Sequence, residues 1–123
     1  MGKPGNTGIR RIIRATRFSV QGFTHAWKHE AAFRQEIWLT LALIPCALWL
    51  GRTSIERFIL IVCCLFVLIV ELLNSAIEAA IDRFGDKHHE LSGRAKDLGS
   101  AAVFLSLVIV VATWLTIAFL RFT

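Results

Sequence analysis

The fold is decided by residues 58–82, which read FILIVCCLFVLIVELLNSAIEAAID. The first thirteen of these residues are all apolar, and acidic or amide side chains appear only from Glu71 onward. An apolar run of this kind, continued by a largely apolar second half, is long enough to cross the hydrocarbon core of a bilayer as a helix. The stretch therefore predicts a transmembrane helix over about residues 57–81 whose second half carries polar groups.

The composition of the whole chain also indicates a membrane protein. Of its 123 residues, 55% are hydrophobic, which is more than a soluble domain of this size can bury. The formal net charge is +5, which here indicates attraction to anionic lipid headgroups and a signal for orientation. Because the basic residues share the chain with long apolar runs, we expect no nucleic-acid partner. The length predicts a single domain over residues 1–123.

Two further spans and one surface helix are expected around this segment. Residues 8–28 place apolar and basic side chains on opposite sides at three- and four-residue steps, which is typical of a helix lying in the membrane interface. The apolar run 37–50 is too short to span alone, so the first span is expected over about 30–50, with charged residues at its inner edge. The third is expected over about 98–120. The predicted fold class is an all-α membrane protein with an amphipathic N-terminal surface helix plus three transmembrane helices.

Local signals define the start of one span and the shape of another. Thr53 is followed three residues later by Glu56, the spacing of a capping box in which each side chain accepts a backbone N–H of the other residue. This pair predicts where the second transmembrane helix begins. Pro45 lies inside the first span, where a proline removes a backbone hydrogen bond and favours a kink.

The distribution of Lys and Arg predicts an orientation in the membrane. Seven of them lie in the amino-terminal part of the chain and four in the second loop and the foot of the third span, against three in the first loop and the tail. Positively charged loops stay on the cytoplasmic side. We therefore expect a multi-pass membrane protein with a cytoplasmic N-terminus and an external C-terminus.

The chemically informative residues form a polar stripe on the second span: Glu71, Asn74, Ser75, Glu78 and Asp82. Steps of three and four residues put them on one face of a helix. A carboxylate at the depth of Glu71 costs several kcal/mol unless it is solvated, paired or protonated. Hydrogen bonding between helices is one explanation, and it suits Asn74 and Ser75 better than it suits two acids.

A site that opens toward the cytoplasm accounts for the acids. Carboxylates at the membrane edge are hard oxygen ligands for Mg²⁺, and a deeper carboxylate can accept a proton from a lipid hydroxyl. Glu90, Arg94 and Asp97 follow at helical spacing at the foot of the third span, beside Lys96, and basic groups there can hold phosphates. No Walker A or GxGxxG sequence occurs. Any ATP site is therefore built from side chains and helix ends, which favours an oligomer with shared sites.

Three segments resemble the prokaryotic diacylglycerol kinase family. They are residues 30–36 (EAAFRQE), 71–79 (ELLNSAIEA) and 89–97 (HELSGRAKD), and the resemblance extends over almost the whole chain. It implies a homotrimer that transfers the γ-phosphate of MgATP to diacylglycerol, giving phosphatidic acid and ADP. It also implies active sites shared between neighbouring subunits at the boundary of membrane and cytoplasm.

The resemblance implies a role for each residue that matches the family. Glu71 corresponds to the catalytic base, and Asn74 orders the base and the lipid. Glu30 and Glu78 correspond to the metal ligands, with Mg²⁺ as cofactor. The implied ATP contacts are Arg11, Phe18, Glu30, Glu78, Lys87, His88, His89, Lys96 and Asp97. Of these, Phe18 replaces a frequent Tyr, and Lys87 and His88 depart from the usual acid and aromatic residues.

The lipid contacts implied by the resemblance are spread over the surface helix and all three spans. They are Arg11, Ala15, Ser19, Trp27, Ala32, Phe33, Arg34, Gln35, Glu36, Trp49, Arg57, Glu71, Ser100 and Trp114. The three tryptophans have a simpler explanation as interface anchors.

Three other functions compete with this interpretation. Members of the same family phosphorylate undecaprenol in other bacteria, although the sequence of residues 30–36 is more similar to the diacylglycerol form. A small transporter would need acids through the full bilayer depth, whereas residues 58–70 and the third span carry none. A non-catalytic membrane adaptor would not need Glu71.

Overall fold

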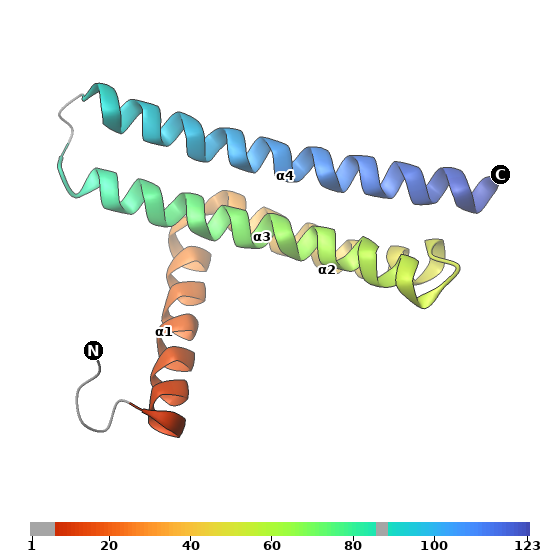
Figure 1. Cartoon of the computed structure of the whole chain (residues 1–123), viewed down its shortest axis with the longest axis horizontal. Helices are drawn as coiled ribbons and strands as arrows, with labels where there is room; N and C mark the ends of the chain where they lie inside the picture. Colours follow the sequence, from red (N-terminus) through yellow and green to blue (C-terminus); the bar gives the residue numbers. More distant parts are fainter. Residues whose placement is uncertain (1–6, 86–88) are drawn as a thin grey trace.

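The computed structural model describes residues 7–85 and 89–123. Within these residues the chain forms four α-helices and no strand, so the expected all-α fold class is confirmed. Figure 1 shows three of the helices side by side and the first one running crosswise to them. The helices are α1 (Gly8–His29), α2 (Ala31–Leu50), α3 (Ser54–Asp82) and α4 (Glu90–Phe122).

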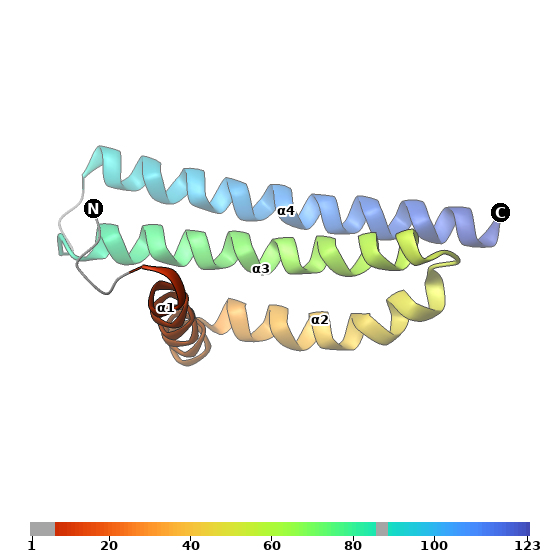
Figure 2. The same cartoon turned by 60° about the horizontal axis from the view of Figure 1, so that its bottom comes forward.

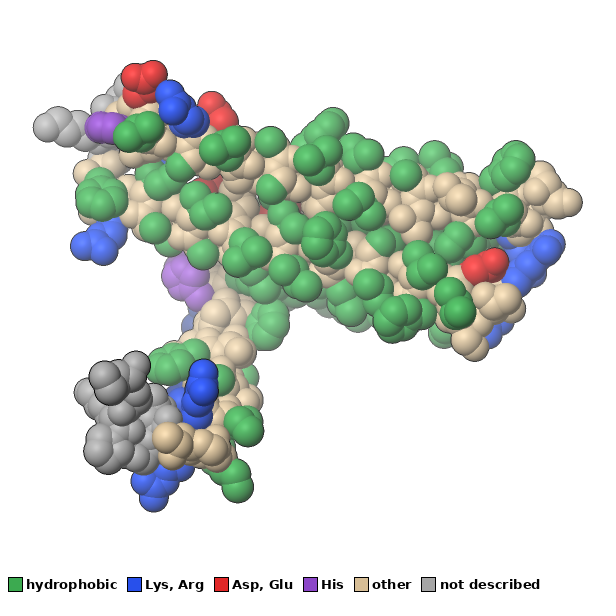
Figure 3. Space-filling view, in the orientation of Figure 1, with side chains coloured by type: hydrophobic (Ala, Val, Ile, Leu, Met, Phe, Trp, Pro, Cys, Tyr) green, Lys and Arg blue, Asp and Glu red, His purple; other side chains and the backbone are tan. Residues whose placement is uncertain are grey.

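Helices α2, α3 and α4 are each long and apolar enough to cross a membrane. The 20 residues of α2 give a length of about 30 Å at the usual rise, and α3 and α4 are longer. Hydrophobic side chains cover the visible side of this bundle, while charged side chains gather near its two ends and on α1 (Figure 3). A chain with this surface is a multi-pass membrane protein.

Helices α3 and α4 extend beyond the apolar segments that predict them. Helix α3 begins at Ser54 and α4 begins at Glu90, whereas the apolar spans are expected from about residues 57 and 98. Their polar first turns continue the same helices outside the apolar region. In α4 this extension carries Arg94, Lys96 and Asp97 on a helix.

A single extended residue separates α1 from α2. Glu30 has φ −118° and ψ 103°, and this break lets α1 leave the bundle crosswise (Figure 2). Arg34 stabilises the corner, because its Nη1 donates to the carbonyl oxygens of Trp27 at 2.6 Å and of Lys28 at 3.3 Å. A cation on the last carbonyls of a helix also interacts favourably with the helix dipole.

The turn between α2 and α3 is closed by hydrogen bonds around the predicted capping box. Thr53 Oγ1 accepts the backbone N–H of Glu56 at 3.1 Å, as expected. The Glu56 carboxylate accepts the N–H of Arg52 at 2.8 Å, one residue before the position that a capping box predicts. Gly51 is required beside them, because a Cβ there would lie 2.6 Å from Arg57 Cγ.

The buried core lies toward the α2–α3 turn. Ala47, Leu50, Leu60 and Ile117 come from α2, α3 and α4 and pack with Trp114 beside them. Helix α2 contains Pro45. Figure 2 shows the second half of α2 bending toward the N-terminal end of α3. This packing fixes the three helices at one end, while α1 diverges from them at the other.

Candidate active site

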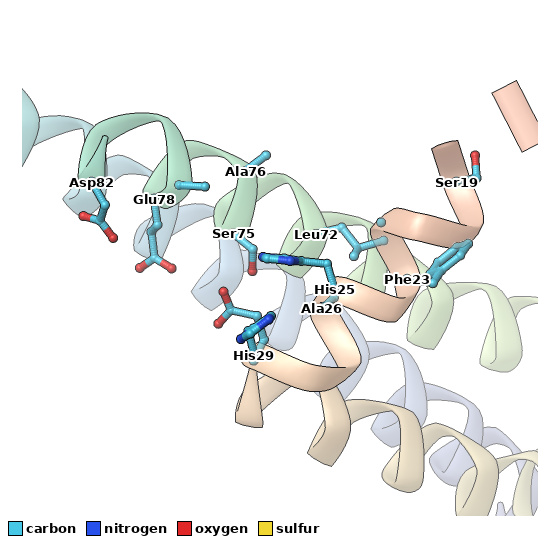
Figure 4. Close-up of a pocket in the computed structure, with 13 residues that line it drawn as sticks. Ser19, Phe23, His25, Ala26, His29, Leu72, Ser75, Ala76, Glu78 and Asp82 are labelled. Carbon is cyan, nitrogen blue, oxygen red and sulfur yellow. The ribbon is translucent and has the colours of Figure 1, made fainter. Parts of the chain in front are cut away.

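A cleft of about 840 Å³ opens between α1 and α3. Its acidic lining consists of Glu30 from the α1–α2 corner and Glu78 and Asp82 from α3. Figure 4 shows Glu78 and Asp82 projecting from α3, with Ser75 one turn further along the helix. We call this the acidic cleft. The two residues expected to bind a metal, Glu30 and Glu78, therefore meet in one place although 48 positions separate them in the sequence.

The polar stripe of α3 divides between two neighbouring helices. Ser75, Glu78 and Asp82 line the acidic cleft on the side of α1. Asn74 instead points to α4, where its Oδ1 lies against Gly99 so closely that a Cβ at position 99 would overlap it. Within the described part of the chain, Asn74 Oδ1 is buried and accepts no hydrogen bond. Because buried polar atoms usually have a partner, this oxygen is suited to accept one from a bound molecule.

Glu71 lies deeper than the acidic cleft. Its exposed fraction is 9%. Leu72 and Ser75, which follow it on α3, line the cleft, whereas Glu71 does not. Two helical turns, or about 10 Å along the axis, separate it from Glu78. The exposure of the acids on α3 therefore increases from buried Glu71 through half-buried Glu78 to exposed Asp82.

Glu71 lies close enough to three other carboxylates to be repelled by them. Glu71 interacts electrostatically with Glu36, Glu30 and Glu78. Like charges in a place of low dielectric are unfavourable unless a cation or protons neutralise them. The arrangement therefore favours a bound cation at this end of the bundle.

The carboxylates of the acidic cleft can supply only part of the coordination shell of Mg²⁺. Mg²⁺ typically takes one or two carboxylates and completes its shell with phosphate oxygens and water. Among residues 7–85 and 89–123, no group of three or more His, Cys, Asp or Glu side chains forms a ready metal site. Glu30 and Glu78 thus suit an ion that is completed by a phosphate substrate, rather than an ion enclosed by protein.

Lys96 connects the foot of α4 to the acidic cleft. Its Nζ lies 2.9 Å from Asp82 Oδ1, and it also interacts electrostatically with Glu78. A lysine at the rim of an acidic cleft can hold a phosphate there. Lys87 and His88, also expected to contact ATP, lie outside the described residues.

His89 and Asp97 belong to the same end of α4 as Lys96. His89 is the N-cap of α4, where its Nδ1 accepts the backbone N–H of Leu91 at 3.1 Å. Asp97 is exposed. His89 therefore has a structural task whether or not it contacts a nucleotide.

The residues expected on the surface helix do not share one place. Arg11 and Phe18 line a separate hollow of about 440 Å³ with Arg17, whereas Ser19 lines the acidic cleft. Ala15 is exposed. Trp27 packs edge-on against Trp38, with 6.0 Å between ring centroids.

The remaining expected lipid contacts are scattered in a single chain. Trp49 packs against Phe122 near the C-terminus, Arg57 donates to the Gly51 carbonyl in the α2–α3 turn, and Trp114 adjoins the core. Arg57 is fourteen residues from Glu71, or about 21 Å along α3. The structure does not bring these three side chains to the acidic cleft of their own chain.

The other expected lipid contacts differ in burial. Phe33 is buried, Arg34 and Glu36 are half-buried, and Ala32, Gln35 and Ser100 are exposed.

Two residues of the acidic cleft were missed by the sequence analysis. His25 and His29 both line it from α1, with 4.4 Å between their ring centroids. Their spacing of four residues, immediately before Glu30, is the signal that indicates a shared face.

Fold and site together define a helical, multi-pass membrane protein with an acidic cleft at one end of its bundle. Residues 17–118 match the sequence profile of the prokaryotic diacylglycerol kinase family. The chain is 52% identical over 108 residues to the diacylglycerol kinase of Escherichia coli (strain K12), which covers 88% of each chain. It is 51% identical over 113 residues to that of Pseudomonas aeruginosa, covering 92% of each. Against that of Helicobacter pylori it is 38% identical over 111 residues, covering 90% of this chain and 87% of the relative.

The chain belongs to the prokaryotic diacylglycerol kinase family. The resemblance found in the sequence is thereby confirmed, and so is the expected enzyme class, a kinase. A kinase requires a nucleotide as its phosphoryl donor, and a membrane-spanning member of this family suits a lipid substrate.

Proposed function

We propose that this protein transfers the γ-phosphate of ATP to diacylglycerol, forming phosphatidic acid and ADP at the cytoplasmic face of the bacterial inner membrane. The main supporting observation is that the acids on α3 become more exposed along the helix, from Glu71 at 9% exposure to Glu78 in a cleft of about 840 Å³. These acids extend from the apolar part of the bundle, where a lipid alcohol lies, to a hollow large enough for phosphate groups. The relatives named diacylglycerol kinase support the choice of lipid.

In the proposed reaction Glu71 is the general base. Its carboxylate accepts the proton of the diacylglycerol hydroxyl while the hydroxyl oxygen attacks the γ-phosphorus. The bond between that phosphorus and the bridging oxygen of ADP breaks, and ADP leaves. Asn74 would order the base and the lipid: its Nδ2 can donate to a lipid oxygen, and its buried Oδ1 can accept a hydrogen bond from Glu71 once Glu71 carries the proton. Alignment of the two reactants supplies much of the acceleration in phosphoryl transfer.

Glu30 and Glu78 would hold Mg²⁺ together with phosphate oxygens of the nucleotide. When bound, the ion neutralises charge on the transferring phosphate. Lys96 at the rim of the acidic cleft would hold phosphate as a point charge. Arg11, Phe18, His89 and Asp97 remain proposed ATP contacts from the resemblance alone.

We further propose a homotrimer whose active sites are shared between subunits, with the N-terminus cytoplasmic. The α1–α2 corner and the α3–α4 connection lie at one end of the bundle, and the α2–α3 turn and the C-terminus at the other (Figure 1). Among the described residues, nine Lys and Arg belong to the first end and three to the second, which supports this orientation. Large apolar side chains such as Phe104 and Leu115 are exposed in a single chain, which leaves surface for lipid and for neighbouring subunits.

An assay with two lipids tests the proposal. Purified protein in detergent micelles receives ATP, Mg²⁺ and either diacylglycerol or undecaprenol, and labelled phospholipid is measured. We expect rapid formation of phosphatidic acid and much slower formation of undecaprenyl phosphate. A faster reaction with undecaprenol would instead assign the protein as an undecaprenol kinase. No product from either lipid would contradict the assignment as a lipid kinase.

A further inference from the structure

The acidic cleft contains a pair of imidazoles with no task in the proposed reaction. His25 and His29 are one helical turn apart on α1, and both are exposed. Their ring centroids are 4.4 Å apart, and the ring planes meet at 43°. Figure 4 shows both side chains projecting from α1 on the side that faces Ser75 and Glu78.

The separation of the two rings suits a shared metal ion. Two histidines at positions i and i+4 of a helix are the zinc-binding pair of the HExxH motif. With a Zn–N distance of about 2.0–2.1 Å, two imidazoles on one tetrahedral ion have ring centroids about 5 Å apart. The observed 4.4 Å differs from this by an amount that small side-chain rotations supply.

The ligand type selects a different class of ion from that expected at Glu30 and Glu78. Carboxylate oxygens suit Mg²⁺, whereas imidazole nitrogen suits Zn²⁺, Ni²⁺ and Cu²⁺. The described residues that line the acidic cleft include three acids and no Lys or Arg. One of the acids, Asp82, is paired with Lys96 from the rim, so Glu30 and Glu78 supply the negative field that favours a cation.

We propose that His25 and His29 form a bidentate site for a transition-metal ion of the Zn²⁺ class on the α1 wall of the acidic cleft. Within the described residues no third His, Cys, Asp or Glu is already in place with them, so water completes the coordination shell. We therefore expect weaker binding than at structural zinc sites, which have four protein ligands. The site depends on imidazole chemistry and not on the proposed kinase reaction.

Calorimetric titration of ZnCl₂ into the purified full chain in detergent micelles tests this site. An excess of MgCl₂ competes with Zn²⁺ for the carboxylates. We expect one Zn²⁺ per chain, and affinity at least about tenfold lower in His25→Ala and in His29→Ala. Both positions are exposed and Ala favours helix more than His does, so α1 should keep its helicity, which circular dichroism measures.

Two matched variants separate chelation from histidine content. Thr24→His combined with His25→Ala keeps the number of histidines but places them five residues apart, on different sides of α1, and should bind as weakly as His25→Ala. His89→Asn removes a histidine outside the acidic cleft and should bind Zn²⁺ like the original protein. Undiminished binding in the spacing variant would overturn the proposal, as would the absence of saturable binding in the original protein.

Discussion

Gly99 and Asn74 make the packing of α4 on α3 part of the candidate active site. At Gly99 a Cβ would overlap Asn74 Oδ1, so the residue proposed to orient the lipid keeps its position only while residue 99 lacks a side chain. A displacement of about 1 Å in a positioning group can cost about 100-fold in rate. The identity of one glycine on α4 therefore determines the geometry at a residue on α3.

Gly99→Ala should lower kcat by about 10- to 100-fold, because the new methyl group must displace Asn74 or α4. The measurement is the rate of phosphatidic acid formation at saturating substrates. Gly93→Ala is the matched control, since a Cβ at Gly93 meets no atom within 4 Å. Equal rates for the two variants would contradict the role of Asn74.

Glu30→Ala and Glu78→Ala should each raise the Mg²⁺ concentration needed for half-maximal rate by about tenfold or more, because each removes one proposed ligand. A titration of kinase activity with MgCl₂ measures this. Glu90→Ala is the control: it also removes one negative charge, but its partner Arg94 is an exposed neighbour on the same helix at 3.6 Å, and such pairs contribute little. An unchanged Mg²⁺ requirement in both cleft variants would rule out the assigned role.

At the scale of the helices, the cleft exists because α1 departs from the bundle at Glu30. The extended backbone there turns the chain, and Arg34 holds the turn through the carbonyls of Trp27 and Lys28. Arg34 is one of the expected lipid contacts, and the structure gives it this second task. The proposed lipid contact and the position of α1 would therefore be linked at one guanidinium group.

Arg34→Ala should loosen the last turn of α1 by about 1 kcal/mol, since it removes a cation from the helix C-terminus. Backbone amides at residues 26–30 should then exchange with deuterium roughly fivefold faster. Arg17→Ala removes a guanidinium from an exposed part of the same helix and should leave that exchange unchanged. The same protection in both variants would show that Arg34 does not hold the corner.

The sequence predicts the helices well because their signals are local. The apolar run of residues 58–70 and the cap at Thr53 act within a few residues, and both appear in α3 as expected. Steps of three and four also predict the polar stripe. They do not predict that Asn74 points to α4 while Ser75 points to α1, because successive residues lie about 100° apart on a helix and the neighbouring helix decides what each one meets.

Features that depend on the placement of whole helices could not be read from spacing. A crosswise α1 is expected of an interface helix, but the acidic cleft also needs α1 to lie beside α3, and that placement depends on one extended residue, Glu30, for which the sequence carries no turn signal. The spacing of His25 and His29 indicates a shared face of α1, but it does not indicate that this face lines a cleft. Trp49 and Trp114 were expected near the substrate, yet in one chain they lie with the other end of the bundle.

At the scale of the whole molecule, one chain leaves the proposed site incomplete. Glu71 and Glu78 lie on α3, but exposed Asp97 lies on α4 and does not line the acidic cleft of its own chain. The bundle also exposes large apolar side chains along its length. Both observations fit subunits that contribute different residues to one site.

Mixing two inactive variants tests whether sites are shared. Glu71→Gln and Asp97→Asn should each be nearly inactive alone, and co-assembled subunits should regain activity because some sites then receive both intact residues. Co-purification through two different tags verifies that mixed oligomers form. If mixed oligomers stay as inactive as the parents, each site is made by one chain.

The proposed mechanism requires Glu71 to remove the proton from a lipid alcohol, and the kcat of Glu71→Gln measures this requirement. The substitution preserves size and removes the charge, so kcat should fall by at least about 100-fold with saturating diacylglycerol and MgATP. Glu56→Gln, in the α2–α3 turn, should remain active because Gln also serves in a capping box. A folded Glu71→Gln protein with a kcat close to that of the original chain would rule out Glu71 as the general base.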